Sequence, residues 1–186
     1  MRYIILLFWL FLFIQFLPAQ EPGYQKVRNA EKKIIAAFDV LYDENTNNKD
    51  SINNIILETF EGILGTWDGF YYKWPELKRV GMVRSKDQKT NIFTWYLKKN
   101  NDNYRYYGFI QYKTGKRKKK QEFHVHKLND MSQDIQDPLN AKITKEKWFG
   151  CLYYDMKKFT HRRDEYYALL GYDFNNRLST IKLIEI

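Results

Sequence analysis

The sequence is poorest in cysteine, since Cys151 is the only one among 186 residues. A single cysteine excludes an intramolecular disulfide. A catalytic thiol would need a neighbouring base, and the sequence around Cys151 points to none. Its place within an apolar, aromatic segment favours the role of a small buried hydrophobic side chain. No cysteine follows the N-terminal apolar segment, so the sequence gives no support to a lipid anchor.

Proline and glycine are also few, with four and nine residues. Together with 44% hydrophobic and 18% aromatic residues, this composition is typical of a packed globular chain and excludes a disordered one. The chain lacks a G-x-S-x-G element, a phosphate-binding loop and a dinucleotide fingerprint, so enzyme is the less favoured class. We expect one domain, because the length suffices for a single core and no internal repeat is present.

Long apolar runs are absent except at residues 3–17, which a single glutamine interrupts. Arg2 precedes the run, and the run is shorter than the roughly 20 residues of a membrane span. This arrangement predicts a secretory signal peptide over residues 1–19. An uncleaved anchor is the alternative, because Leu17 is larger than the usual residue near a cleavage site. We therefore expect residues 20–186 to be exported, periplasmic or extracellular, and soluble without a further membrane span.

Helical periodicity comes first in the exported part of the chain. Apolar residues recur at steps of three and four over residues 25–42 and again from residue 50 or 51 to 65. This spacing predicts two amphipathic helices that pair through their apolar faces. Asp50 or Ser51 is the expected N-cap of the second helix. Residues 67–74 are aromatic and irregular, and Pro75 ends them.

From residue 78 the pattern changes to that of β-strands. Short runs of β-branched and aromatic residues alternate with polar turns up to residue 186, which predicts an antiparallel meander. The expected fold is α+β, with two N-terminal helices packed on a curved antiparallel β-meander. The predicted strands are 78–84, 91–97, 104–112, 121–128, 148–156, 165–173 and 180–186. The predicted core includes Trp95, Phe109, Trp148, Leu152, Leu169, Leu170 and Ile184.

Positive charge is in excess, since Lys and Arg outnumber Asp and Glu by 31 to 22 and the net charge is +9. A basic balance raises nonspecific affinity for polyanions. The densest basic run lies in a predicted hairpin, and one interpretation is a binding site for phosphate, sulfate or carboxylate polymers. A solvated hairpin whose lysines keep strands from aggregating is the more frequent meaning of such a run. The run is Lys116, Arg117, Lys118, Lys119 and Lys120.

Two histidines form the candidate metal site. His124 and His126 flank Val125 in a predicted strand, so both side chains should lie on one face. Such a pair binds zinc when His161 or a carboxylate supplies a third ligand. No E-x-x-H spacing or cysteine pair accompanies them, so strand histidines without a metal are favoured. We expect no cofactor.

Two further patterns have a structural and a functional interpretation. Tyrosines surround Arg105 over residues 104–107, which resembles a stacking platform for single-stranded nucleic acid. Alternation along a strand separates these side chains onto two faces, so we expect packing and no nucleic-acid partner.

Carboxylates such as the pair at 164–165 suggest sugar hydrolysis only if two of them face each other across a cleft. Asp173 precedes two asparagines, where an aspartate usually shapes a turn.

Five short segments follow one another along the chain in an order and spacing that are similar to a known pattern. They are T-W at 94–95, Y-G-F-I-Q at 107–111, W-F-G-C-L-Y-Y at 148–154, A-L-L-G-Y-D at 168–173 and K-L-I-E at 182–185. Together they resemble an uncharacterised family of secreted proteins from Bacteroidetes, whose usual pattern has W-Y-G-A-L-Y-Y and L-L-G-W-D strands followed by K-I-I-E. Each segment alone is a weak motif.

The resemblance covers residues 54–186 and has two departures. Tyr172 stands where the family usually has Trp. Such proteins also continue well past the K-I-I-E strand, whereas this chain stops at Ile186, so we expect a short or truncated member. The resemblance implies an exported α+β protein. The family has no assigned activity, so the resemblance implies no reaction.

We expect an envelope or periplasmic module without enzymatic activity, which acts through binding or structure. Its expected partners are acidic polymers or an envelope component. A hydrolase of envelope or scavenged polymers is the alternative. A deep polar cleft with convergent carboxylates or histidines would favour the hydrolase. A closed aromatic core with only a basic edge would favour the binding module.

Overall fold

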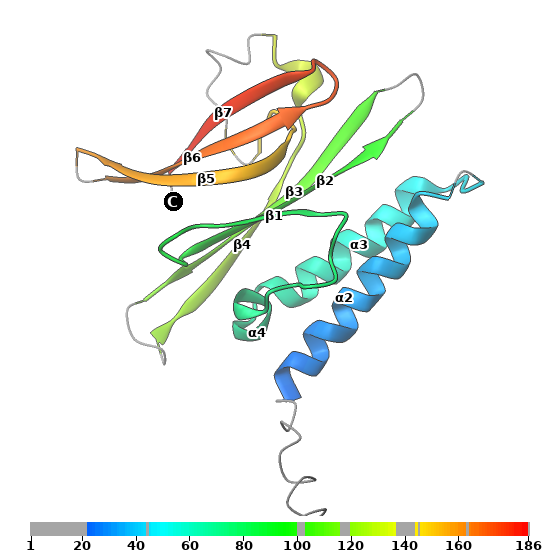
Figure 1. Ribbon diagram of the computed structural model, residues 1–186, viewed down its shortest axis with the longest axis horizontal. Coiled ribbons are helices and arrows are strands. Elements are labelled where there is room, and N and C mark those ends of the chain that lie inside the picture. Colours follow the sequence, from blue (N-terminus) through cyan, green and yellow to red (C-terminus); the bar gives the residue numbers. More distant parts are fainter. Residues whose placement is uncertain are drawn as a thin grey trace, which may run out of the picture.

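The computed structural model describes residues 22–43, 45–99, 103–115, 120–136, 144, 146–162 and 164–185. Two long helices are followed by antiparallel strands, which confirms the predicted α+β class (Figure 1). The helices are α2 (Pro22–Leu41), α3 (Lys49–Leu64) and α4 (Trp67–Tyr71), with a 3-10 turn, η3 (Ser132–Asp134). The strands are β1 (Gly81–Arg84), β2 (Thr90–Lys98), β3 (Tyr104–Thr114), β4 (Glu122–Leu128), β5 (Leu152–His161), β6 (Asp164–Asp173) and β7 (Leu178–Glu185). The predicted signal peptide lies outside the described residues.

The strands form two sheets. Strands β1 to β4 make the first sheet and β5 to β7 the second, and each sheet is a meander of neighbouring antiparallel strands. Figure 1 shows α2 and α3 on one side of the first sheet and the second sheet on the other. The long connection after β4 carries the chain from one sheet to the other. The first sheet is therefore the middle of three layers.

The core between the helices and the first sheet is aromatic. The ring of Phe60 on α3 lies 5.4 Å from that of Trp95, 5.5 Å from that of Phe93 and 5.8 Å from that of Phe109. The Trp95 indole donates a 2.8 Å hydrogen bond to Asn53 Oδ1, and both residues are buried. Without this acceptor, the buried indole N–H would give up its hydrogen bond to water and gain none in return. The helical spacing of α3 therefore places one apolar face and one matched polar group on the sheet.

The opposite face of the first sheet packs against β5 and β6. Strand β2 is buried at six consecutive residues, as in a strand covered on both sides. Cys151 is completely buried in this second core, as predicted for a small hydrophobic side chain. The buried residues of this core are Val83, Ile92, Tyr106, Ile110, Leu128, Trp148, Cys151, Tyr153, Met156, Tyr167 and Leu169.

Several local predictions differ from the structure. The second helix begins at Lys49, and Asn48, rather than Asp50 or Ser51, accepts the capping hydrogen bond from the Ser51 backbone N–H. Residues 67–71, expected to be irregular, form a helical turn whose N-cap is Thr66. An asparagine or threonine cap satisfies the same free N–H groups as an aspartate or serine.

The predicted strand 148–156 begins late. Trp148 makes an isolated parallel bridge with Asp130, and β5 starts at Leu152. Trp95, Phe109, Trp148 and Leu169 are buried as predicted. Leu152 and Leu170 are only half-buried. Strand alternation explains Leu170, because Tyr167 and Leu169 point inward and Leu170 therefore points outward. The side chain of Ile184 lies outside what the structure describes.

Among the helices that the structure describes, none combines the length and the apolar character that a membrane crossing requires.

Candidate functional site

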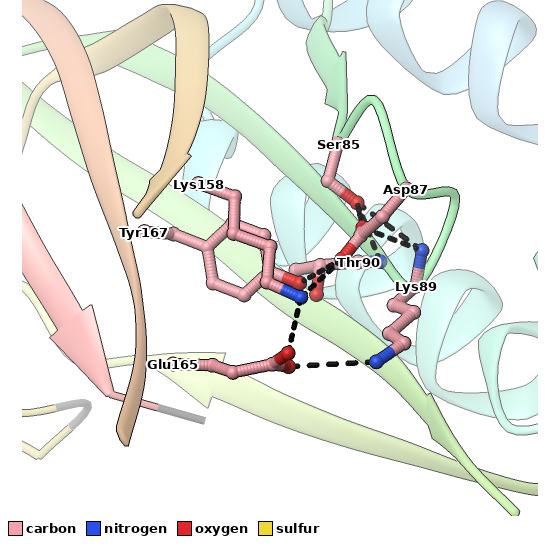
Figure 2. Close-up of polar contacts among 7 residues, drawn as sticks. All are labelled: Ser85, Asp87, Lys89, Thr90, Lys158, Glu165 and Tyr167. Atoms are coloured by element: carbon pink, nitrogen blue, oxygen red, sulfur yellow. Dashed lines mark hydrogen bonds and ion pairs between the residues drawn. The ribbon is translucent and has the colours of Figure 1, made fainter. Parts of the chain in front are cut away.

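A cluster of charged and hydroxyl side chains joins the β1–β2 turn to the second sheet (Figure 2). The Asp87 carboxylate accepts hydrogen bonds from Ser85 Oγ at 2.6 Å and from the Tyr167 hydroxyl at 2.9 Å. It also pairs with Lys158 Nζ at 3.0 Å, and Lys158 in turn pairs with Glu165. Asp87 lies on the turn, whereas its partners Lys158 and Tyr167 come from β5 and β6. The cluster therefore holds the turn of one sheet against the face of the other.

The pKa values in this cluster fix its charges at neutral pH. Burial alone would raise the pKa of Asp87, but hydrogen bonds from Ser85, Lys158, the Lys89 backbone N–H and Tyr167 outweigh burial and hold the pKa well below its usual value of 3.8. Hydrogen bonds to Glu165 and Asp87 raise the pKa of Lys158, and burial raises the pKa of Tyr167. General acid–base catalysis works best with a pKa near the working pH. Each of these shifts moves the pKa of the group further from pH 7, so the cluster suits a structural role.

A second buried network closes the β6–β7 turn. The Asp173 carboxylate accepts hydrogen bonds from the Tyr106 hydroxyl at 2.9 Å, from the Asn175 backbone N–H at 2.9 Å and from Asn176 Nδ2 at 2.6 Å. Asp173 is 1% exposed, and burial raises the pKa of Tyr106. The predicted turn-shaping role of Asp173 is confirmed, with the addition that it ties the turn to β3.

The outer edge of β3 is capped by side chains where β4 no longer covers it. Asn175 accepts a 2.7 Å hydrogen bond from the Tyr104 backbone N–H and donates a 2.8 Å bond to the Tyr104 carbonyl. Asp130 Oδ2 accepts a 2.8 Å bond from the Tyr106 backbone N–H. Exposed strand edges recruit further strands, and side-chain caps satisfy the same groups. At the start of β3, side chains therefore satisfy backbone groups on the side where β4 is missing, while β2 pairs with the other side.

A groove of about 1220 Å³ lies beside this capped edge, and we call it the polar groove. Its lining residues come from 46–50 before and in α3, from 98–99 and 103–105 at the facing ends of β2 and β3, from 130–134 around η3, and from 175–176 in the β6–β7 turn. In Figure 1 this is the end of the molecule where the α2–α3 loop approaches the tips of β2 and β3. Four segments distant in sequence thus meet at one site.

The carboxylates of the polar groove are largely engaged. Asp50 pairs with Lys99. Asp130 accepts bonds from the backbone N–H groups of Tyr106, Ser132 and Gly150 as well as from the Ser132 hydroxyl. Asp134 is exposed, and its carboxylate neither forms an ion pair with nor accepts a hydrogen bond from the described part of the chain. The groove therefore offers one uncommitted carboxylate and not a pair.

The basic run predicted as a polyanion site is described only at its end. Lys116, Arg117, Lys118 and Lys119 lie outside the described residues, and Lys120 is exposed before β4. Polyanion binding by this run stays a prediction.

The two histidines lie on one face of β4, as their spacing predicts. The His124 ring stacks on Tyr112 with 4.8 Å between ring centres, and the His126 ring lies 5.5 Å from the same tyrosine. His124 Nε2 is 3.0 Å from Thr114 Oγ1, and His126 Nε2 is 3.3 Å from the Tyr112 hydroxyl. Across the described residues, no three His, Cys, Asp or Glu side chains gather closely enough to hold a metal ion. In this arrangement the imidazoles pack on a tyrosine.

Residues 104–107 alternate between the faces of β3. Tyr106 is 1% exposed in the core between the sheets, whereas the Tyr107 ring stacks on Trp95 on the helix side, 5.9 Å away. Arg105 is exposed and lies over the Tyr107 ring at 5.8 Å. The predicted separation of these side chains onto two faces is confirmed.

Sequence reasoning missed the polar groove. Its only local sign is asparagine in several turns, at Asn47, Asn103, Asn175 and Asn176, which the sequence presents as ordinary turn residues. Comparison with known proteins adds no assignment, because the chain matches no family model, no curated protein and no solved structure.

Proposed function

We propose that the protein is an exported module that binds an acidic polymer or another envelope component and acts by binding rather than by catalysis. The apolar segment at 3–17 and the resemblance to secreted proteins from Bacteroidetes support an extracytoplasmic location. The basic balance of the chain supports an acidic partner.

The observation that carries the proposal is the polar groove with its engaged carboxylates. A ligand site needs a concave surface with positioned polar groups, and the groove supplies both. Its walls are strand ends and turns fixed by hydrogen bonds, among them those of Asn175 and Asp130. A fixed wall lowers the ordering cost of binding.

Hydrolysis is the second candidate, because a polar cleft that contains carboxylates was the feature expected to favour it. Glycoside hydrolysis needs two carboxyl groups that flank the scissile bond, one to donate and one to accept a proton or attack. In the groove Asp50 faces Lys99, and Asp130 is saturated by backbone donors. Asp134 would be left without a partner carboxylate, which favours binding.

The two functions separate in one experiment. The purified protein is run in native gels that contain polygalacturonate, dextran sulfate or unmodified dextran, and the same polymers are assayed for new reducing ends after incubation. We expect retardation by at least one acidic polymer and no new reducing ends. New reducing ends that disappear in Asp134→Asn would establish the hydrolase instead. Absence of retardation by every polymer would refute the binding proposal for acidic polymers.

Export has its own test. The full chain is expressed in a Gram-negative bacterium, and the intact mass of the protein is measured after fractionation. We expect a periplasmic or secreted product that lacks residues 1–19. A membrane-bound product of full mass would establish the uncleaved anchor.

A further inference from the structure

We infer that the polar groove binds an anionic oligosaccharide, with Arg105 and Lys49 holding the acidic groups of the sugar chain. This inference rests on the proposed binding function and adds the site and the chemical class of the ligand.

The lining of the groove favours a hydroxyl-rich ligand. Met131 and Tyr104 are the two apolar or aromatic side chains among the described residues that line it, and the other lining side chains are polar or charged. Pockets for apolar ligands or peptide side chains are lined mainly by hydrophobic residues, so such ligands fit poorly here. Asn47, Asn103 and Gln133 present side-chain amides that make no hydrogen bond to the described part of the chain. Each amide offers two donors and one acceptor oxygen, which is the combination that a sugar hydroxyl can use both ways.

The charges of the groove favour an anion. Once Lys99 is paired with Asp50, and Asp130 with its backbone donors, Arg105 and Lys49 remain without an ion pair or hydrogen bond from their charged groups among the described residues. Asp134 is the one carboxylate in a comparable state. Among all charged side chains that line the groove, cations outnumber carboxylates by four to three, so the lining carries one net positive charge; the cations are Lys49, Lys98, Lys99 and Arg105, and the carboxylates are Asp50, Asp130 and Asp134.

Arg105 is placed to bind an acidic group in two-point fashion. Its guanidinium lies over the Tyr107 ring at 5.8 Å, which restrains the side chain while its edge N–H groups stay available. A guanidinium presents paired donors that match the two oxygens of a carboxylate or the oxygens of a sulfate. Lys49 comes from the start of α3, so the two cations approach the ligand from different walls of the groove.

The groove is separate from the basic run. The run at 116–120 follows the end of β3, whereas the groove adjoins its beginning, and β3 spans Tyr104–Thr114. An anionic chain bound at the groove and one bound at the hairpin would therefore respond to different substitutions, which makes the two sites distinguishable.

The test measures binding of oligogalacturonate and of the neutral galactose oligosaccharide of equal length by isothermal titration calorimetry. The groove variant is R105Q with K49Q. The matched control, K26Q with K157Q, removes the same charge from two residues that are exposed outside both the groove and the basic run. We expect the groove variant to bind oligogalacturonate at least about tenfold more weakly, as for loss of charge-assisted hydrogen bonds, and the control to change affinity less than about twofold.

Thermal midpoints of both variants should stay close to that of the wild type, because the four charged groups make no ion pair or hydrogen bond with the described residues and the contact of Arg105 with the Tyr107 ring is at an exposed site. An equal loss of affinity in the groove variant and the control would overturn the site, since it would show diffuse attraction. Equal affinity for the neutral and acidic sugars, unchanged in the groove variant, would overturn the ligand class and leave the binding function standing. Failure of the wild type to bind any acidic polymer or oligosaccharide would overturn the proposed binding of acidic polymers itself.

Sulfate and carboxylate are distinguished by a third ligand. A sulfated oligosaccharide of the same length is added in competition with oligogalacturonate. If the sulfated chain displaces oligogalacturonate poorly, carboxylate is the preferred anion of the groove. If it displaces oligogalacturonate well, sulfate is the preferred anion.

Discussion

The ion cluster between the two sheets leads to a quantitative prediction for Asp87→Asn. The substitution keeps the shape of the side chain and removes its charge. The asparagine oxygen can still accept from Ser85 and the Lys89 backbone, but the new amide N–H₂ faces two donors, the Tyr167 hydroxyl and the Lys158 ammonium. The variant therefore loses one ion pair and one hydrogen bond to a buried phenol.

The expected loss of unfolding free energy is about 2–3 kcal/mol. A hydrogen bond to a charged group contributes roughly 1.5–3 kcal/mol, and a neutral one about 1 kcal/mol. The two contributions sum to about 2.5–4 kcal/mol, and solvent screening lowers this sum to about 2–3 kcal/mol, because the Asp87 and Lys158 side chains keep 24% and 25% of their exposure. Lys158 also retains Glu165 as a partner.

The same variant should alter the pH dependence of stability. The folded-state pKa of Asp87 lies below its usual value of 3.8, so its contribution is complete above about pH 5 and is lost as the pH falls toward the folded-state pKa. At pH 3 the linkage relation removes about 1 kcal/mol of that contribution. The difference between wild type and variant should therefore be smaller at pH 3 than at pH 7 by this amount.

The assay is urea unfolding followed by tryptophan fluorescence at pH 7 and pH 3. Asp39→Asn is the matched control, because Asp39 forms a surface pair with Arg79 at 3.3 Å and the two side chains are 63% and 46% exposed. We expect the control to lose less than about 0.5 kcal/mol. A loss below about 1 kcal/mol for Asp87→Asn at pH 7, or a loss that is equal at both pH values, would refute the role assigned to the cluster.

The remaining predictions concern the capped strand edge and the basic run. Asn175→Ala should lower the unfolding free energy by about 1–2 kcal/mol and speed hydrogen exchange at the Tyr104 amide. Asn103→Ala is the control and should do neither, because the Asn103 side-chain amide makes no hydrogen bond to the described residues. Unchanged exchange at Tyr104 in Asn175→Ala would show that the cap is not needed. Replacement of residues 116–120 by Ser and Gln should abolish salt-sensitive retention on a heparin-like resin if the run binds polyanions. Retention equal to that of the wild type would instead assign the run to solvation of the hairpin.

The local pattern of side chains determined the secondary structure. Apolar steps of three and four predicted α2 and α3 to within a few residues, and short β-branched and aromatic runs predicted all seven strands. Burial of Trp95, Trp148 and Cys151 followed from the same patterns. These properties depend on neighbours within one turn of helix or two residues of strand, so a single sequence contains them.

Tertiary structure alone decided how the strands divide into two sheets and which polar groups meet. Asp87 and Tyr167 are 80 residues apart in the sequence, and Asn175 caps a strand 71 residues before it. The sequence patterns did not single out Asp87 or the cap at Asn175, because a hydrogen bond between residues far apart in the chain has no periodicity. The polar groove likewise arises where four separate segments converge. The physical reason is that local spacing fixes the direction of a side chain, whereas the packing of layers fixes what it faces.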